Sequence, residues 1–380
     1  MHGSGPAGLV RIFNTDAAIL EAREERQDLP CDVTPVKPVL GLDLRFHSGY
    51  EVTVPLRELA GAENLLTMIF RVTPENGEPV YFSQRINVPS IEADAKGDAY
   101  LQGAFDLGEG KYHVDWLMRD RSERVCSSNW QIEAALPSRD RQLEVALPPG
   151  ALQAAERDSF HDEPSPEKLG AEPPLSVKVI VNFAPQNSRS ATLQPLDTSA
   201  LLAVLRSIAR EPRIGKFTLV AFNVQEQRVV YRQDAADHID FPALGEALQS
   251  LSLGTVDLRR LSQKHGETSF LASLITREVL PDEPVDAVIF AGPKVLLEEN
   301  VPDQTLKVVG EPEFPIFYMN YNLHPQSTPW RDAIGNAVKF FKGTEYTISR
   351  PRDLWYAWTE IVSRMVKSKF GRRAAPASSQ

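Results

Sequence analysis

The stretch Val177-Lys178-Val179-Ile180-Val181-Asn182 decides the fold of the C-terminal half of the chain. Its nearly unbroken run of β-branched residues predicts a strand that is buried on both faces, as strands in parallel sheets are. Apolar residues at helical spacing follow it, namely Leu201, Val204, Leu205 and Ile208. A buried strand, a loop and an amphipathic helix in this order predict the first part of an open α/β sheet.

The same alternation of strands and helices continues from residue 176 to residue 368. Lys216–Asn223 and Gln227–Gln233 predict a hairpin, while Val285–Ala291 and Pro315–Asn320 predict two further buried strands. The last helix is expected to begin at Pro351, since proline suits the first helical position. The pattern predicts a doubly wound sheet with one antiparallel edge strand, followed by a disordered tail at residues 369–380.

Residues 40–136 have a different rhythm, in which short apolar segments are separated by turns. The expected strands are Gly41–Phe46, Tyr50–Pro55, Leu65–Val72, Val80–Val88, Ala99–Leu107, Lys111–Arg119 and Val125–Glu133. Short strands at this spacing predict an antiparallel sandwich. The run Gly110-Lys-Tyr112-His-Val114-Asp-Trp116 resembles the late strand of immunoglobulin and fibronectin type III domains.

Two segments lie outside these domains. Residues 1–39 are expected to form an N-terminal extension. Residues 137–175 are rich in proline and acidic side chains and are expected to form a linker, with a short helix around Ala151–Arg157.

Composition excludes several classes of protein. Lys and Arg total 41 against 51 Asp and Glu, and this net charge of −10 argues against binding nucleic acid through a positive field. No apolar run reaches the ~20 residues of a membrane-spanning helix. Two cysteines are too few for a cysteine-rich zinc module. Cys31 and Cys126 are either a disulfide pair or two buried thiols, and both interpretations stay open.

The order of elements in residues 176–368 resembles a von Willebrand factor A-type domain. The segments Phe46–Pro55 and Gly110–Trp116 are similar to segments of acidobacterial proteins related to that family. The resemblance implies export from the cytoplasm. The first ten residues, however, have neither the charged nor the apolar region of a signal peptide.

Members of the family carry a metal-ion-dependent adhesion site, and its ligand pattern can be compared with the residues of this chain. The pattern Asp-x-Ser-x-Ser falls on Asn182, Ala184 and Gln186. The pattern's threonine, in the loop before a later helix, falls on Thr268, and its final Asp falls on Ala291. Of these five positions only Thr268 matches the pattern. Because a divalent cation prefers carboxylate ligands, we expect no metal and no cofactor here, and Thr268 is expected to cap a helix beginning near Phe270.

The carboxyl edge of the expected sheet remains a candidate binding site, since ligands of doubly wound sheets lie there. The polar residues placed near it are Asn182, Gln186, Thr268, Asn320, Asn322 and His324, with Gly292 among them. They form a nearly uncharged rim that suits hydrogen bonding to a protein or peptide. Polar residues that merely furnish surface loops would give the same pattern.

The sequence therefore predicts a non-enzymatic binding or scaffold protein with no catalytic residues, whose partner is a protein or peptide. One alternative is a hydrolase whose site is assembled around Ser269 and His265 or His324. Another is residual cation-dependent adhesion, in which Glu267 or Asp197 substitutes for the missing carboxylates.

Overall fold

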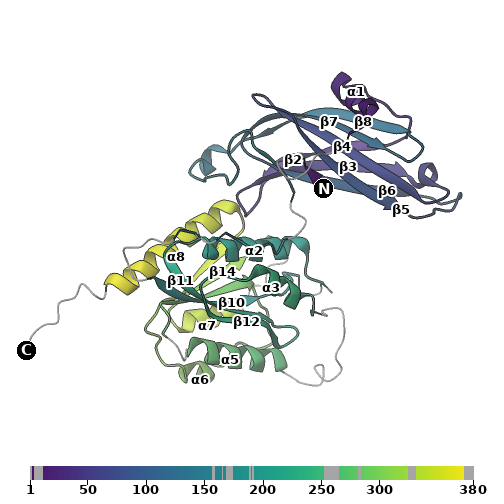
Figure 1. Cartoon of the computed structure of the whole chain (residues 1–380). Helices are drawn as coiled ribbons and strands as arrows, with labels where there is room; N and C mark the ends of the chain where they lie inside the picture. Colours follow the sequence, from purple (N-terminus) through teal and green to yellow (C-terminus); the bar gives the residue numbers. More distant parts are fainter. Residues whose placement is uncertain are drawn as a thin grey trace, which may run out of the picture. The chain divides into compact units, whose positions relative to one another are not determined.

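The computed structural model describes residues 2–3, 12–155, 159–164, 166–167, 174–187, 190, 192–251, 265–280, 284–323 and 331–371. The chain divides into two compact units, Met1–Arg157 and Asp158–Gln380 (Figure 1). The first unit is built from two sheets, and the second from one mixed sheet with helices. At this level the predicted two-part fold class is confirmed.

The first unit is an antiparallel sandwich. One sheet has the strand order β1-β5-β4-β7-β8 and the other has the order β2-β3-β6-β9. The strands are β1 (His2–Gly3), β2 (Asp32–Leu40), β3 (Phe46–Pro55), β4 (Asn64–Pro74), β5 (Val80–Val88), β6 (Asp98–Leu107), β7 (Gly110–Arg119), β8 (Val125–Ala134) and β9 (Leu152–Ala154). Short 3₁₀ turns follow β3, at Leu56–Leu59, and β8, at Ser138–Asp140.

The first strand of the second sheet lies earlier than expected. The strand predicted at Gly41–Phe46 is wrong, because Gly41 donates its N–H to the carbonyl of Arg45 at 2.8 Å and closes a turn. β2 instead occupies Asp32–Leu40 and pairs with β3. Pro35 and Pro38 are tolerated there because β2 is an edge strand. Part of the expected N-terminal extension thus belongs to the sandwich.

Alternate residues of both sheets fill the space between them. Tyr50, Phe70, Phe82, Phe105 and Trp116 form a contiguous aromatic cluster with ring centroids 5.0–5.8 Å apart. All five are essentially inaccessible to solvent. Aromatic burial of this kind supplies much of the hydrophobic stabilisation of a small sandwich.

A helix covers the outer face of the larger sheet. α1 (Asn14–Ala22) places Ile19 and Leu20 against Ile69, Leu117 and Val125. Beside this contact the guanidinium of Arg71 donates to the carboxylate of Asp115 at 2.8 Å and to the carbonyl of Leu20 at 3.0 Å.

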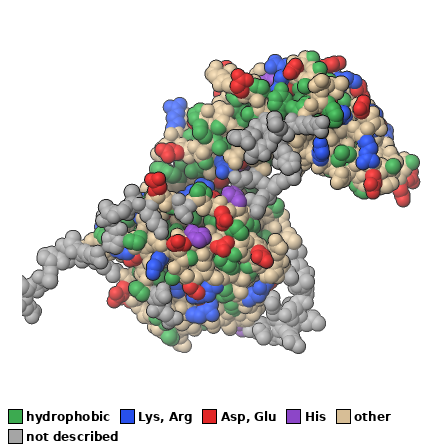
Figure 2. All heavy atoms as spheres, in the orientation of Figure 1, with side chains coloured by type: hydrophobic (Ala, Val, Ile, Leu, Met, Phe, Trp, Pro, Cys, Tyr) green, Lys and Arg blue, Asp and Glu red, His purple; other side chains and the backbone are tan. Residues whose placement is uncertain are grey.

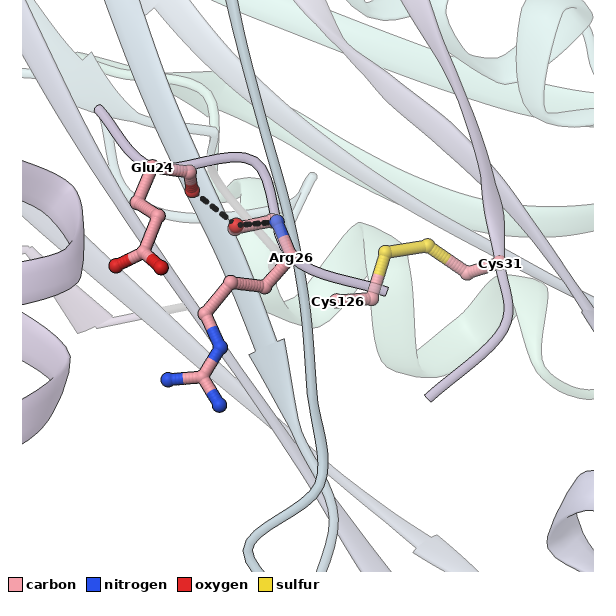
Figure 3. The surroundings of a disulfide bond; sticks show 5 residues. Glu24, Arg26, Cys31 and Cys126 are labelled. Atoms are coloured by element: carbon pink, nitrogen blue, oxygen red, sulfur yellow. Dashed lines mark hydrogen bonds between the residues drawn. A yellow bond between two sulfur atoms is a disulfide. The ribbon is translucent and has the colours of Figure 1, made fainter. Parts of the chain in front are cut away.

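A disulfide joins Cys31 to Cys126, with Cα atoms 6.3 Å apart (Figure 3). Cys126 lies in β8 of one sheet, whereas Cys31 immediately precedes β2 of the other. Next to the bridge the Ser127 hydroxyl donates to the carbonyl of Glu24 and accepts the N–H of Arg26. These contacts fix the chain between α1 and β2 against β8.

The expected linker contributes to both units. The helix predicted at Ala151–Arg157 is wrong, since residues 152–154 form β9 and pair with β6. Leu152 and Ala154 pack against the sandwich core, a spacing of two that belongs to a strand. Farther along, the carboxylate of Glu163 binds Arg206 at 2.7 Å and Arg210 at 2.9 Å, within the second unit.

The second unit has a six-stranded sheet with the order β12-β11-β10-β13-β14-β15. The strands are β10 (Leu175–Asn182), β11 (Ile214–Asn223), β12 (Arg228–Ala236), β13 (Ala287–Pro293), β14 (Ile316–Tyr321) and β15 (Thr344–Ile348). Only the pairing of β12 with β11 is antiparallel. The predicted hairpin with an antiparallel edge strand is confirmed.

Helices cover both faces of this sheet (Figure 1). They are α2 (Pro195–Ala209), α3 (Phe241–Leu248), α5 (Gly266–Val279), α6 (Asp303–Lys307), α7 (Ala333–Phe340) and α8 (Pro351–Gly371). α5, α6 and α7 pack on the face that carries Ile180 and Val220. α2 and α8 lie on the opposite face.

Surface charges of both signs are interspersed over the visible faces of the two units (Figure 2). Within the described parts of the chain, no helix combines the length and the apolar character needed to cross a membrane.

Candidate functional site

The carboxyl ends of the parallel strands meet at one edge of the second unit's sheet. Asn182 ends β10, Gly292 lies near the end of β13, and Asn320 pairs with Gly292 on β14. Gly292 has a φ of +145°, and a Cβ there would lie 2.9 Å from the Cβ of Asn182. Glycine therefore lets the ends of β10 and β13 approach closely.

Asn182 and Asn320 are buried completely, so neither forms part of an exposed rim. The Asn182 side-chain oxygen accepts the N–H of Val224 at 3.3 Å, and the Asn320 amide donates to Glu345 at 2.9 Å. Asn182 Nδ2 and Asn320 Oδ1 have no hydrogen-bond partner among the described residues. Both amides are thus enclosed in the protein, and Asn182 stands where the pattern of the adhesion site has its first carboxylate.

Gln186 and Asn322 come together as the sequence predicts. Gln186 donates to the Asn322 side-chain oxygen at 3.3 Å and accepts the N–H of Leu323 at 2.9 Å. The backbone N–H of Gln186 donates to the buried carboxylate of Asp197 at 3.3 Å. This network connects the loop after β10 to α2 and to the segment after β14. His324 lies outside the described residues.

Thr268 has a different role from the expected one. α5 begins at Gly266, so Thr268 lies within its first turn and is not its N-cap. The N-cap is His265, which adopts a left-handed conformation with φ of 64°. The Thr268 hydroxyl donates to the carbonyl of Glu299 at 3.3 Å, which ties α5 to the loop after β13.

The five positions of the expected adhesion site do not fit a divalent cation. Asn182, Ala184 and Ala291 are buried, and none of them offers a carboxylate. Asp197 is one proposed substitute for a missing carboxylate, but its carboxylate accepts the N–H of Gln186 and holds the loop after β10. In the described residues no three His, Cys, Asp or Glu side chains gather as metal ligands. Burial and repulsion from Glu298 raise the pKa of Glu267, the other proposed substitute.

The hydrolase arrangement of Ser269 with His265 is not assembled among the described residues, and the version with His324 lies outside them. Ser269 is exposed on α5, and its backbone N–H donates to the His265 carbonyl at 2.9 Å, as in an ordinary helix. The His265 ring lies 3.7 Å from the Glu299 carboxylate. Among the described residues no imidazole is hydrogen-bonded to the Ser269 hydroxyl, as activation of a serine nucleophile requires.

Sequence reasoning missed Asp332, which caps α7 at the same edge. One carboxylate oxygen accepts the N–H groups of Val295 at 3.1 Å and Ile334 at 3.2 Å. Burial raises the pKa of Asp332 to about 6, although backbone hydrogen bonds oppose the shift. An Asp directly before the apolar helical stripe at Ile334 was the available sequence signal for this cap.

The protonation of Asp332 gives a testable pH dependence. Because its folded pKa of about 6 exceeds the ordinary 3.8, the folded state binds the proton more tightly. Stability should therefore fall as the pH rises from about 4 to above 6. We expect Asp332→Asn to keep the cap, remove this fall and stabilise the second unit by about 1–3 kcal/mol at pH 7.5.

Urea unfolding at pH 4, 6 and 7.5 measures this effect. Asp240→Asn is the matched control, because Asp240 also caps a helix, α3, by accepting the N–H of Ala243 at 2.9 Å. A stabilisation by Asp332→Asn of equal size at pH 4 and pH 7.5 would contradict the prediction.

No family model and no curated protein matches this chain. Among solved structures, the PilB minor pilin from Streptococcus sanguinis is 7% identical over 81% of this chain and 89% of its own, with a TM-score of 0.29. A glycosyl hydrolase family 2 member from Bacteroides cellulosilyticus is 11% identical over 84% and 39%, with a TM-score of 0.20. A β-glucuronidase from Bacteroides uniformis is 9% identical over 82% and 38%, with a TM-score of 0.18. TM-scores this low carry no argument about this chain.

Proposed function

We propose that this chain is a non-enzymatic protein- or peptide-binding protein. Its second unit would be a von Willebrand factor A-like domain with a degenerate metal site, and its first an immunoglobulin- or fibronectin III-like sandwich. The observation that carries the proposal is the order of strands in the second unit. When the strands are numbered in chain order from β10 as strand 1 to β15 as strand 6, they lie side by side in the order 3-2-1-4-5-6, and strand 3 (β12) is antiparallel. The order reverses beside strand 1 (β10).

Recognition without a cation is supported by the groups at the carboxyl edge. Asn182 and Ala291 stand at the two positions where a shared metal would need carboxylates. The accessible part of this edge combines the half-buried Asn322 with Leu296, which is 53% exposed on the loop after β13. A polar amide and an exposed apolar side chain at the same edge of the sheet suit a protein surface or a peptide.

Partner capture from an extract of the source organism tests this function. Immobilised full-length protein should retain the same partner in EDTA and in magnesium. Asn322→Arg should reduce that capture at least tenfold, since it adds charge and bulk to the proposed contact surface. Val308→Arg is the control, because it adds the same charge at a position that is 70% exposed and outside the rim.

Quantitative mass spectrometry of the retained proteins gives the readout. Capture that needs magnesium would contradict metal-independent recognition. Capture that is lost equally in both variants, or in neither, would show that the carboxyl edge is not the contact surface.

A further inference from the structure

A groove of about 430 Å³ lies on the first unit. A row of small side chains crosses the sheet within it. Val36 pairs with Gly49, and Gly49 pairs with Ala104. Phe105 pairs with Ala154, so the next residue, Ala155, extends the row beyond Ala104, and it also lines the groove.

This row lies on the outer face of the β2-β3-β6-β9 sheet. The neighbours of Gly49 and Ala104 in β3 and β6, Tyr50 and Phe105, point into the sandwich core. Since successive side chains of a strand alternate between faces, Gly49 and Ala104 face outward. Gly49 has no room for a side chain, because a Cβ would lie 2.0 Å from the carbonyl oxygen of Gly103. The floor of the groove at Gly49 is therefore formed by backbone atoms alone.

Polar side chains stand on both sides of this floor. The cross-strand pair His47 and Asp106 lies on one side, and the pair Glu51 and Gln102 lies on the other. His47 is held by Asp106 at 2.8 Å and by Asp43 at 3.0 Å. Hydrogen bonds to these carboxylates raise its pKa to about 10, so it is a cation at neutral pH. Glu51 and Gln102 remain exposed.

An exposed aromatic ring lies beyond the lining of the groove, on the same face of β6. Tyr100 is the next outward-facing residue after Gln102, and 79% of it is exposed. Burying such a ring against a ligand would remove apolar area that the fold alone leaves in water. Tyr100 and the groove thus form one surface, with the Gln102 amide between them.

The sheet backbone limits what this surface can bind. β3 pairs with β6 along the floor and with β2 on both sides of a register shift between Val36 and Val39, so most of its N–H and C=O groups are already used. A peptide lying over β3 would therefore gain little of the main-chain ladder that strand addition relies on. A ligand that brings many hydroxyl groups and a flat apolar ring face would instead match amides, carboxylates and one exposed aromatic ring.

We propose that the outer face of the β2-β3-β6-β9 sheet binds an oligosaccharide, with the ring at one end stacked on Tyr100 and the other end of a chain of about three rings in the groove over Ala104, about 13 Å along β6. Glu51 and Gln102 would accept and donate hydrogen bonds to its hydroxyls. The groove volume is within the range of small-ligand sites and accommodates about two sugar rings. This site is separate from the carboxyl edge of the second unit and is independent of the function proposed there.

Isothermal titration calorimetry of the full chain tests the proposal. The probes are maltotriose, cellotriose, xylotriose, mannotriose and triacetylchitotriose, each up to 10 mM, and a hexapeptide of alternating serine and glycine. At least one trisaccharide should bind. Tyr100→Ala and Ala104→Leu should each weaken that binding at least tenfold, the first by removing the ring and the second by filling the floor.

Both variants change exposed side chains, so they should fold, and unchanged circular dichroism checks this. Tyr356→Ala, which removes a half-exposed tyrosine from α8 of the other unit, should leave saccharide binding unaltered. The proposal is overturned if no trisaccharide binds, or if binding survives in both groove variants. Binding of the hexapeptide alone, lost in the same variants, would identify a peptide groove and equally overturn it.

Discussion

Replacing Cys31 and Cys126 with serine is expected to lower the free energy of unfolding of the first unit by about 4.7 kcal/mol. The bridge spans 95 residues, and in the chain-entropy treatment closing a loop of that length restricts the unfolded chain by about this amount. The bridge also holds the segment before β2 against β8 of the opposite sheet. The corresponding fall in melting temperature should be about 10 °C.

Urea unfolding of the oxidised full chain measures this loss, with the two units followed as separate transitions. Reduction of the wild-type protein with dithiothreitol should reproduce the effect of the double substitution, because both open the same loop. The transition of the second unit should not move. An unchanged first transition in the double variant would show that the two thiols are not bonded in solution.

Glu278→Leu is expected to destabilise the second unit by about 3–5 kcal/mol. Lys178 is only 6% exposed, and its ammonium contacts the Glu278 carboxylate at 3.2 Å. Arg232 and Arg277 each donate to the same carboxylate at 2.8 Å. Glu278→Leu would leave the buried Lys178 ammonium with the backbone carbonyl of residue 278 at 3.2 Å but without a carboxylate to balance its charge. An unbalanced buried charge costs far more than the ion pair itself contributes.

The double variant Lys178→Met, Glu278→Leu is the matched control, and it should recover most of the loss. Burial alone would raise the pKa of Glu278, but hydrogen bonds from Arg232 and Arg277 and the nearby Lys178 hold it below its ordinary value. The wild-type protein should therefore lose stability as the pH falls below about 4.5. A single variant as stable as wild type would contradict the buried-pair account.

Much of the fold was predictable because hydrophobic periodicity determines which faces are buried. The run Val177–Val181 and the hairpin at Lys216–Gln233 were sufficient to predict a central buried strand and an antiparallel edge. The predictions failed where a few residues decide between turn and strand. β2 contains two prolines, and only its place at the edge of a sheet makes that acceptable. β9 has three residues, too few for a period to be visible.

The candidate site was predicted less completely. Strand ends could be placed at one edge, which brought Gln186 and Asn322 together correctly. Burial could not be predicted at single positions, and Asn182 and Asn320 proved to be fully enclosed. The outer groove of the sandwich depends on the cross-strand pairing of Gly49 with Ala104, and such register is not encoded in either strand by itself.

The central proposal is that the second unit is a von Willebrand factor A-like domain whose carboxyl edge lacks the ligands of a metal-ion-dependent adhesion site. Thermal unfolding of the full chain with 10 mM magnesium or with EDTA tests it most directly, comparing wild type with the variant Asn182→Asp, Ala184→Ser, Gln186→Ser, Ala291→Asp. Together with Thr268, these substitutions restore the five-ligand pattern. We expect no shift for wild type and a magnesium-dependent rise of several degrees in the variant, since a ligand at 100 times its dissociation constant stabilises by about 2.7 kcal/mol. A rise in wild type, or none in a variant that still folds, would contradict the account.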